Sequence, residues 1–456
     1  MLTRLRLLSL GAVLLAAPTV AAAPAAPGAR LSAPVAGDIA ADKLATDVPA
    51  VSASIDRAPV AMSWPIEQSA DDLQDRPAAH RAESRAWWRR LDVAALAAGV
   101  PLPISEPGAL LKLSPQDGAA IAVDALELVD PQGRVYSGID ALRPLTDPSH
   151  LRSAGASFAP GTAMFTLRPD LGAGAFVLRA RVRAPLLVHV LERDADAYLS
   201  LEPDTDLALV GGRLQVRAHL RDGEAVLKAR SIRGELIAPD GETTRFDLTR
   251  APDGSYRADV PAPRRAAAPG VLHTLQIHAE GVTARGVPVR RTATNAVSIA
   301  APTARYTGGV TVEDVADGRL RIRLQVEVGA ASRFAVSGVL HGTNRSGKLQ
   351  PIGVGQAARW LEAGPGELVL EFDEATLKAA GLRGPYELRD LRLVDQGRLA
   401  TVHRQARAGA PVRATLTCPS GHPTCSARVV RRSLRRPEPR AFGCLGELRP
   451  SGRSVS

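Results

Sequence analysis

Cysteine is scarce in this sequence. Of its 456 residues only Cys418, Cys425 and Cys444 are cysteines, and all three lie near the C-terminus. No disulfide can form N-terminal to them, which excludes a small scaffold held by disulfides. We expect the folded part to depend on apolar burial and strand pairing. In an oxidising compartment Cys418 can bridge Cys425, which leaves Cys444 unpaired.

Long apolar runs are also lacking. The one pronounced run, Leu7 to Ala17, follows Arg4 and Arg6 and precedes the small residues 21–23. This is the pattern of a secretory signal peptide with its cleavage site. No later stretch approaches the roughly 20 apolar residues that a membrane helix needs. We expect residues 1–23 to be removed and the mature protein to be secreted (extracellular) or periplasmic, without a transmembrane segment.

Positive charge is not spread along the chain. The formal net charge is +10, but residues 426–456 alone hold eight Arg and two Glu. In the body of the chain the basic residues alternate with acidic ones and form no basic stripe. A nucleic-acid partner is therefore not expected, because phosphate binding needs clustered cations on one face.

Motifs of known catalytic and metal sites are absent or incomplete. Neither H-E-x-x-H nor C-x-x-C occurs. "GVGQAA" at 353–358 matches a relaxed dinucleotide fingerprint, but it lacks the required strand and long helix, so we expect a short helical crossover. "GASFA" around Ser157 ends in Ala and is an incomplete nucleophile elbow. His273 and His278 are five apart on a predicted strand and should point to opposite faces.

One acidic region could bind a hard cation. It comprises Glu192, Asp194, Asp196, Glu202, Asp204 and Asp206. Calcium takes several oxygen ligands and stiffens joints between sandwich domains, although the EF-hand pattern is not met. The hypothetical calcium ligands are Glu192, Asp194, Asp204 and Asp206, and calcium is the one cofactor considered. The alternative is a solvated acidic linker.

From about residue 100 onward, apolar and polar side chains alternate with a period of two. In "RLQVRAHL" (213–220) and "RLRIRLQVEV" (319–328) every second residue is apolar. Strict alternation indicates antiparallel sheets with one face buried and the other in water. "APDG" occurs twice, at 238–241 and 251–254, and "DPQG" at 130–133. Pro, Asp and Gly in these positions predict tight turns between consecutive strands.

The strongest helix prediction is "SRAWWRRLDVAALAAG", residues 84–99. Ser84 can cap it, Gly99 can end it, and Trp87 and Leu91 lie on one helical face. We expect the tryptophans, Trp87 and Trp88, to anchor the helix to a sheet. The alternative is a platform for binding carbohydrate. Near Asp390 the alternation changes phase, which predicts a β-bulge.

These patterns predict a mainly all-β chain of serial immunoglobulin-like antiparallel β-sandwich domains with a short N-terminal helix. The predicted divisions are a signal peptide (1–23), a flexible Ala/Pro-rich leader (24–80), an N-terminal helix plus β domain (81–196), an immunoglobulin-like sandwich (197–302), a C-terminal sandwich (303–408) and a basic disordered tail (409–456).

Three segments carry a further signal: residues 84–115, 336–364, which include "GVGQAARWLEAG", and 381–408, which include "GPYELRDLRLVD". Together they resemble a family of secreted Gram-negative bacterial proteins, the "domain of unknown function 4785" family. The likeness covers roughly residues 60–408. It implies immunoglobulin-like sandwiches and export, and it supplies no catalytic residues.

Together these observations favour a secreted or periplasmic protein that acts as a binding or structural module and is not an enzyme. The expected partner is a protein, a surface glycan or a second copy of the chain. One alternative is a hydrolase, or a hydrolase accessory protein, with its site at a domain junction. Another is an adhesive stalk stiffened by calcium.

Overall fold

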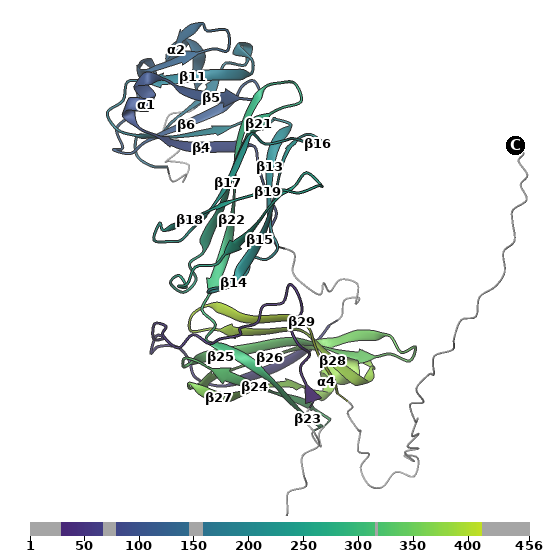
Figure 1. Ribbon diagram of the computed structural model, residues 1–456. Helices are drawn as coiled ribbons and strands as arrows, with labels where there is room; N and C mark the ends of the chain where they lie inside the picture. The colour runs from purple at the N-terminus through teal and green to yellow at the C-terminus, as the bar shows by residue number, and fades with distance from the viewer. Residues whose placement is uncertain (1–28, 67–78, 146–157, 315–317, 413–456) are drawn as a thin grey trace, which may run out of the picture. The chain divides into compact units, whose positions relative to one another are not determined.

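The computed structural model describes residues 29–66, 79–145, 158–314 and 318–412 (Figure 1). Its regular structure is mostly strand, arranged as three β-sandwiches, each with two sheets around one apolar core. This confirms the all-β fold class. Among the helices in these ranges, none has the length and apolar character needed to cross a bilayer.

The first sandwich has a five-stranded sheet of order β4-β12-β6-β10-β9 and a four-stranded sheet of order β5-β11-β7-β8. Its core includes Leu111, Phe176 and Val188. The strands are β4 (Ala86–Leu91), β5 (Val100–Ile104), β6 (Leu110–Pro115), β7 (Leu126–Val129), β8 (Val135–Ser137), β9 (Leu142–Pro144), β10 (Ala163–Leu167), β11 (Gly174–Ala180) and β12 (Leu186–Leu191); the helical turns are α1 (Val93–Ala98), η2 (Val123–Ala125), α2 (Gly138–Ala141) and η3 (Pro169–Leu171).

The second sandwich pairs a sheet of order β19-β20-β15-β13-β3 with a sheet of order β14-β22-β21-β17-β18. Here β14 runs parallel to β22. Its core includes Leu199, Val216 and Ile277. The strands are β3 (Ala82–Ser84), β13 (Ala197–Pro203), β14 (Leu207–Leu209), β15 (Arg213–Asp222), β16 (Ala225–Val226), β17 (Ser231–Ile237), β18 (Thr243–Asp247), β19 (Thr249–Arg250), β20 (Tyr256–Pro261), β21 (His273–Val282) and β22 (Pro288–Ala300).

The third sandwich combines a sheet of order β1-β23-β24-β27 with one of order β2-β26-β25-β28-β29. Its core includes Leu324, Phe334 and Phe372. The elements are β1 (Ala29–Arg30), β2 (Val60–Pro65), β23 (Ala304–Asp314), β24 (Leu320–Val328), β25 (Ser332–Thr343), β26 (Leu349–Leu361), β27 (Gly364–Phe372), α4 (Glu374–Ala380), β28 (Arg383–Asp395) and β29 (Ala400–Val412).

Part of the predicted flexible leader is ordered. Strand β1 pairs with β23, and β2 pairs with β26, so residues 29–66 are bound to the third sandwich. Between the two strands, Ile39 exchanges backbone hydrogen bonds with Arg404. The composition-based prediction was wrong for residues 29–66, because their backbone pairs with distant strands and Ile39 is buried in a small apolar cluster.

The predicted 84–99 helix is shorter than expected. Residues 86–91 form β4, and only Val93–Ala98 are helical, with the side chain of Asp92 rather than Ser84 accepting the capping hydrogen bond from Ala95 N. Gly99 ends the helix with a positive φ, as expected. Trp87 is buried in the core as predicted, but it lies on strand β4 and not on a helix. Trp88, also on β4, stacks on His189 at a centroid distance of 5.7 Å.

The "GVGQAA" segment is not a helical crossover. It belongs to β26, which lies between β2 and β25. Gly353 and Gly355 explain this, since a Cβ on Gly353 would lie 2.7 Å from the Trp64 carbonyl oxygen and one on Gly355 would lie 2.7 Å from the Phe372 ring. The glycines therefore allow close packing in a sandwich and do not form a phosphate-binding loop.

The predicted turns and bulge are present. Gly133, Gly241 and Gly254 have positive φ, and each donates its N–H to the carbonyl three residues earlier. Asp390 has φ 45°, and β28 has one extra residue against β25 between the pairs Ser337–Arg392 and Val339–Arg389. His273 and His278 lie on opposite faces of β21, as expected.

Candidate functional site

A cavity of about 830 Å³ lies where the second sandwich, the third sandwich and the N-terminal segment meet. Its described walls are residues 45–50 of that segment, Val210, the 264–272 loop between β20 and β21, residues 298–301 at the end of β22, and residues 397–400 at the turn between β28 and β29. The 264–272 loop contains Pro269 and Gly270, and Gly270 has φ 75°. Both residues favour irregular backbone over a strand.

The walls of this junction cavity are mainly small and apolar. Among its described lining residues none is aromatic, histidine or cysteine. Two wall backbone groups are already paired, since Val210 N donates to the Ala300 oxygen and Ala45 N to the Pro302 oxygen, both at 2.9 Å. Most lining side chains are apolar, while the accessible surface of the cavity also includes a large polar share.

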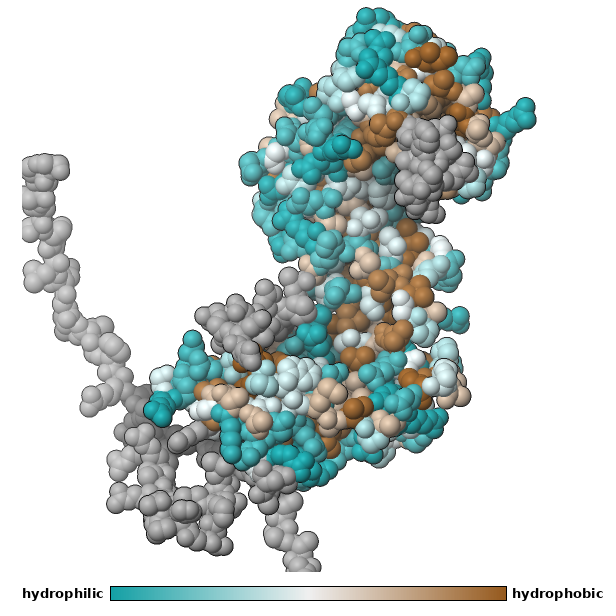
Figure 2. Space-filling view, turned by 180° about the vertical axis from the view of Figure 1, so that it is seen from behind, coloured by the Kyte–Doolittle hydropathy of each residue, from teal (hydrophilic) through white to brown (hydrophobic). Residues whose placement is uncertain are grey.

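Three large apolar side chains at the cavity are exposed to solvent. Val271, Leu272 and Leu399 are exposed by 44%, 50% and 68%. Leu399 has φ 50°, a conformation that a branched side chain rarely adopts. Its Cδ1 would lie 3.2 Å from a Cβ built on Gly270, so the two loops touch. On the face that Figure 2 shows, apolar residues (brown) are exposed among hydrophilic ones (teal).

Charge at the cavity is predominantly positive. Arg264 and Arg265 are exposed, and neither has an ion pair with a residue of the described ranges. Arg398 binds the Asp395 carboxylate at 2.9 Å and the Pro49 oxygen at 2.9 Å, but its buried Nε has no hydrogen-bond partner among the described residues. Asp47 is the one acidic side chain in the described lining.

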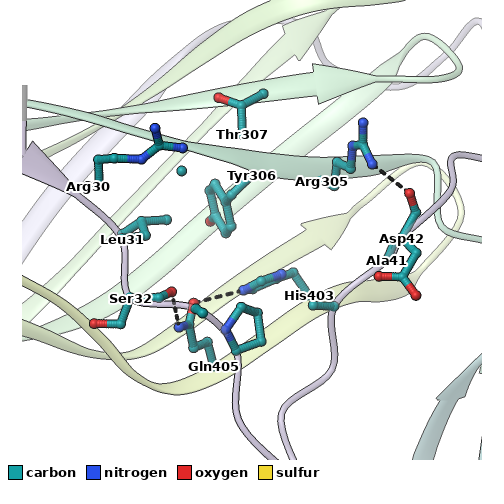
Figure 3. Close-up of a pocket in the computed structure, with 14 residues that line it drawn as sticks. Arg30, Leu31, Ser32, Ala41, Asp42, Arg305, Tyr306, Thr307, His403 and Gln405 are labelled. Carbon is teal, nitrogen blue, oxygen red and sulfur yellow. Dashed lines mark hydrogen bonds between the residues drawn. The ribbon is translucent and has the colours of Figure 1, made fainter.

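A second cavity, of about 650 Å³, lies between β23, β29 and the N-terminal segment (Figure 3). The Tyr306 ring meets the His403 ring edge-on at 4.8 Å, and burial lowers the pKa of His403. Gln405 Nε2 donates to the Ser32 oxygen at 2.8 Å, and Arg305 donates to the Asp42 oxygen at 2.6 Å. These polar groups hold the N-terminal segment in place and are not free for a ligand.

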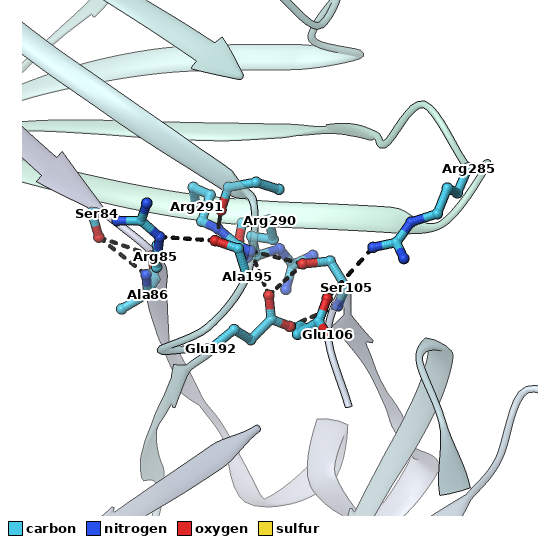
Figure 4. Close-up of polar contacts among 11 residues, drawn as sticks. Ser84, Arg85, Ala86, Ser105, Glu106, Glu192, Ala195, Arg285, Arg290 and Arg291 are labelled. Carbon is cyan, nitrogen blue, oxygen red and sulfur yellow. Dashed lines mark hydrogen bonds and ion pairs between the residues drawn. The ribbon is translucent and has the colours of Figure 1, made fainter. Parts of the chain in front are cut away.

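The junction between the first and second sandwiches contains a buried ion pair (Figure 4). Arg291 of β22 donates to Glu192, which follows β12, at 2.5 Å, and both side chains are fully buried. Ser105 links the two, since Arg291 donates to its hydroxyl at 2.7 Å and its backbone N–H donates to Glu192 at 2.7 Å. Burial lowers the pKa of Arg291.

The four hypothetical calcium ligands do not converge. Glu192 binds Arg291, so a guanidinium stands where a metal cation was predicted. Asp194 is exposed, Asp204 accepts from Gln215 N at 3.0 Å, and Asp206 binds Arg404 of β29 at 3.4 Å. Across the described ranges no group of three or more His, Cys, Asp and Glu is arranged to hold a metal ion.

Some sequence hypotheses fall outside the described ranges. These are the signal peptide, Ser157, the three cysteines and the basic tail from 413 onward. Conversely, the junction cavity was missed by sequence reasoning. The one signal in the sequence was the segment "RRAAAPGVL" (264–272), which breaks the alternation between two strands and begins with two adjacent arginines.

Comparison with known proteins identifies the family but no activity. Residues 51–192 match the DUF4785 N-terminal domain and residues 303–410 match the DUF4785 C-terminal domain, which together cover more than half of the chain. No curated protein matches the chain.

Among solved structures, a DUF4785 family protein from Legionella pneumophila subsp. pneumophila str. Philadelphia 1 is similar, with TM-score 0.64 and 21% identity over 81% of this chain and 99% of that one. Weaker likenesses are to Escherichia coli alpha-2-macroglobulin (TM-score 0.26, 13% identity, 66% of this chain and 20% of that one) and to a tetra-tandem repeat of a large adhesion protein (TM-score 0.18, 14% identity, 69% and 72%). The last two are too distant to support an argument. The two domain matches and the shared fold show that the chain belongs to the DUF4785 family.

Proposed function

We propose that this chain is an exported, non-enzymatic binding module that holds an apolar ligand in the junction cavity. The observation that carries the proposal is an apolar cavity of about 830 Å³ with the strained, exposed Leu399 at its edge. Volumes of about 300–1,000 Å³ and positions between domains are typical of ligand sites. Strained backbone also concentrates at such sites. Export to the periplasm or beyond is supported by the N-terminal signal pattern of Arg4, Arg6 and the following apolar run.

The hydrolase alternative receives less support from the geometry. Nucleophilic hydrolysis needs a nucleophile with a base in hydrogen-bond reach. The described lining of the junction cavity offers Ser298 but no histidine. At the other junction Ser105 bonds to Glu192, but Ser105 is buried and is held between that carboxylate and Arg291. A substrate has no access to it.

Filling the cavity tests the proposal. The purified mature protein is titrated with 1-anilinonaphthalene-8-sulfonate, whose fluorescence rises in apolar surroundings. We expect saturable binding to the wild type and a loss of at least about tenfold in affinity for Ala268→Trp, which places an indole at the cavity wall, equivalent to about 1.4 kcal/mol. Ala225→Trp, on an exposed strand of the same sandwich, is the matched control and should bind like the wild type.

Circular dichroism and thermal melting of each variant show that the fold is retained. Absence of dye binding to the folded wild type, or equal binding to the wild type and Ala268→Trp, would show that the cavity is not a binding site.

A further inference from the structure

The geometry points to a single-chain carboxylate amphiphile, an aliphatic chain ending in a carboxylate, as the class of ligand that the junction cavity takes. This inference rests on the proposed function and adds to it the chemistry of the ligand. It follows from two properties of the cavity: the character of its walls and the charge at its edge.

The walls suit an aliphatic chain better than a sugar ring or a peptide. Ala266, Ala267, Ala268, Ile299 and Ala300 are among the apolar lining residues. Sugar-binding sites usually present aromatic faces, and the described lining has none. Peptide binding by strand addition needs a free strand edge. At the 298–300 end of β22, β14 already pairs with one edge, and the Ala300 oxygen accepts from Val210 N.

The edge of the cavity supplies the charge complement. Arg264 and Arg265 are adjacent, exposed and without a carboxylate partner in the described structure. A guanidinium presents two parallel N–H donors that match the two oxygens of a carboxylate. Asp47 also lines the cavity and opposes an anion, but the two free arginines outnumber it.

Arg398 adds little to this edge. Asp395 neutralises its guanidinium, and its Nε is buried. The charge of Arg264 and Arg265 therefore favours a ligand with an oxygen-rich, anionic end.

The test compares probes of equal chain length by isothermal titration calorimetry on the full mature protein, below their critical micelle concentrations. The probes are dodecanoate, dodecyltrimethylammonium and dodecanol, together with an acidic Leu/Glu heptapeptide. We expect dodecanoate to bind at least about tenfold more tightly than the other probes.

Paired variants test whether the positive charge at the cavity edge is what favours dodecanoate. Arg264→Gln with Arg265→Gln should weaken dodecanoate binding about fivefold, because exposed charge pairs are individually weak, and should leave dodecanol binding unchanged. Arg217→Gln with Arg233→Gln removes two exposed arginines from strands of the same sandwich and should change neither.

Three other outcomes would contradict the carboxylate preference, the kind of ligand or the cavity's role in binding. If dodecanol binds as tightly as dodecanoate, or the Arg264/Arg265 variant binds dodecanoate like the wild type, the carboxylate is not recognised, although the apolar site stands. If the heptapeptide binds and dodecanoate does not, the partner is a protein segment. If neither these probes nor the fluorescent dye binds the folded protein, the proposed function itself fails.

Discussion

The buried pair of Arg291 and Glu192 should be a main determinant of how the first two sandwiches unfold. Both side chains are fully buried, and Arg291 makes further hydrogen bonds to the Ala197 oxygen at 2.9 Å and the Arg290 oxygen at 2.7 Å. Glu192→Gln removes the counter-charge and leaves the guanidinium out of water. Breaking a buried pair in this way typically costs about 3–5 kcal/mol, and we expect a loss of stability in that range.

The assay is differential scanning calorimetry of the mature protein, combined with urea unfolding followed by circular dichroism. Because Arg291 belongs to the second sandwich and Glu192 to the end of the first, Glu192→Gln should also separate their unfolding into distinct transitions. The double variant Glu192→Leu with Arg291→Met should cost at least about 2 kcal/mol less than the sum of the single variants, since it leaves no unpaired buried charge.

An exposed ion pair provides the control. Arg213 and Asp259, on neighbouring strands of the second sandwich, have side chains that are 57% and 43% exposed, so Asp259→Asn should cost less than about 1 kcal/mol. The reasoning is refuted if Glu192→Gln destabilises the protein no more than Asp259→Asn, or if the two sandwiches unfold together in both variants.

Three further predictions concern single positions. Burial lowers the pKa of His403 below its ordinary value of 6.5, so the unfolded chain binds more protons than the folded one at lower pH. The free energy of unfolding should therefore fall as pH drops from about 7 to 5, and it should fall less in His403→Gln. The exposed His80→Gln should show the same fall as the wild type, and Tm measured against pH checks both. Leu399→Asn should raise stability by up to about 1 kcal/mol, because Asn tolerates φ 50°, while weakening dye binding; a loss of stability would show that Leu399 is not strained. Gly355→Ala should cost about 1–3 kcal/mol in urea unfolding, because its Cβ would lie 2.7 Å from the Phe372 ring, and a neutral result would contradict the close packing of β26.

The alternation of apolar and polar residues predicted the strands that have one face exposed to solvent. β15 and β24 show the expected period, because their polar side chains lie in water. β25 is buried along nearly its whole length on both faces, and such a strand carries no alternation to read. β4 was mistaken for helix because residues four apart, such as Trp87 and Leu91, share a face in both a helix and a strand.

The junction cavity could not be predicted, because it depends on contacts between distant parts of the chain. Gly270 and Leu399 lie more than a hundred residues apart in sequence, and neither position marks a site by itself. The acidic region was visible in the sequence, but its partners Arg291 and Arg404 were not, since arginine is abundant throughout. Composition identified the charges, and only the fold shows which of them pair.

The attachment of β1 and β2 to the last sandwich makes the chain a nested assembly. The third sandwich holds the first described residues and also the last, and the first two sandwiches are inserted within it. Domains generally fold from the N-terminus as a chain is synthesised. β1 and β2 therefore stay unpaired until β23 and β26 have been synthesised. Completion of this third domain therefore requires synthesis through β29, and a product cut short before β26 would leave β2 as an unpaired strand open to aggregation or proteolysis.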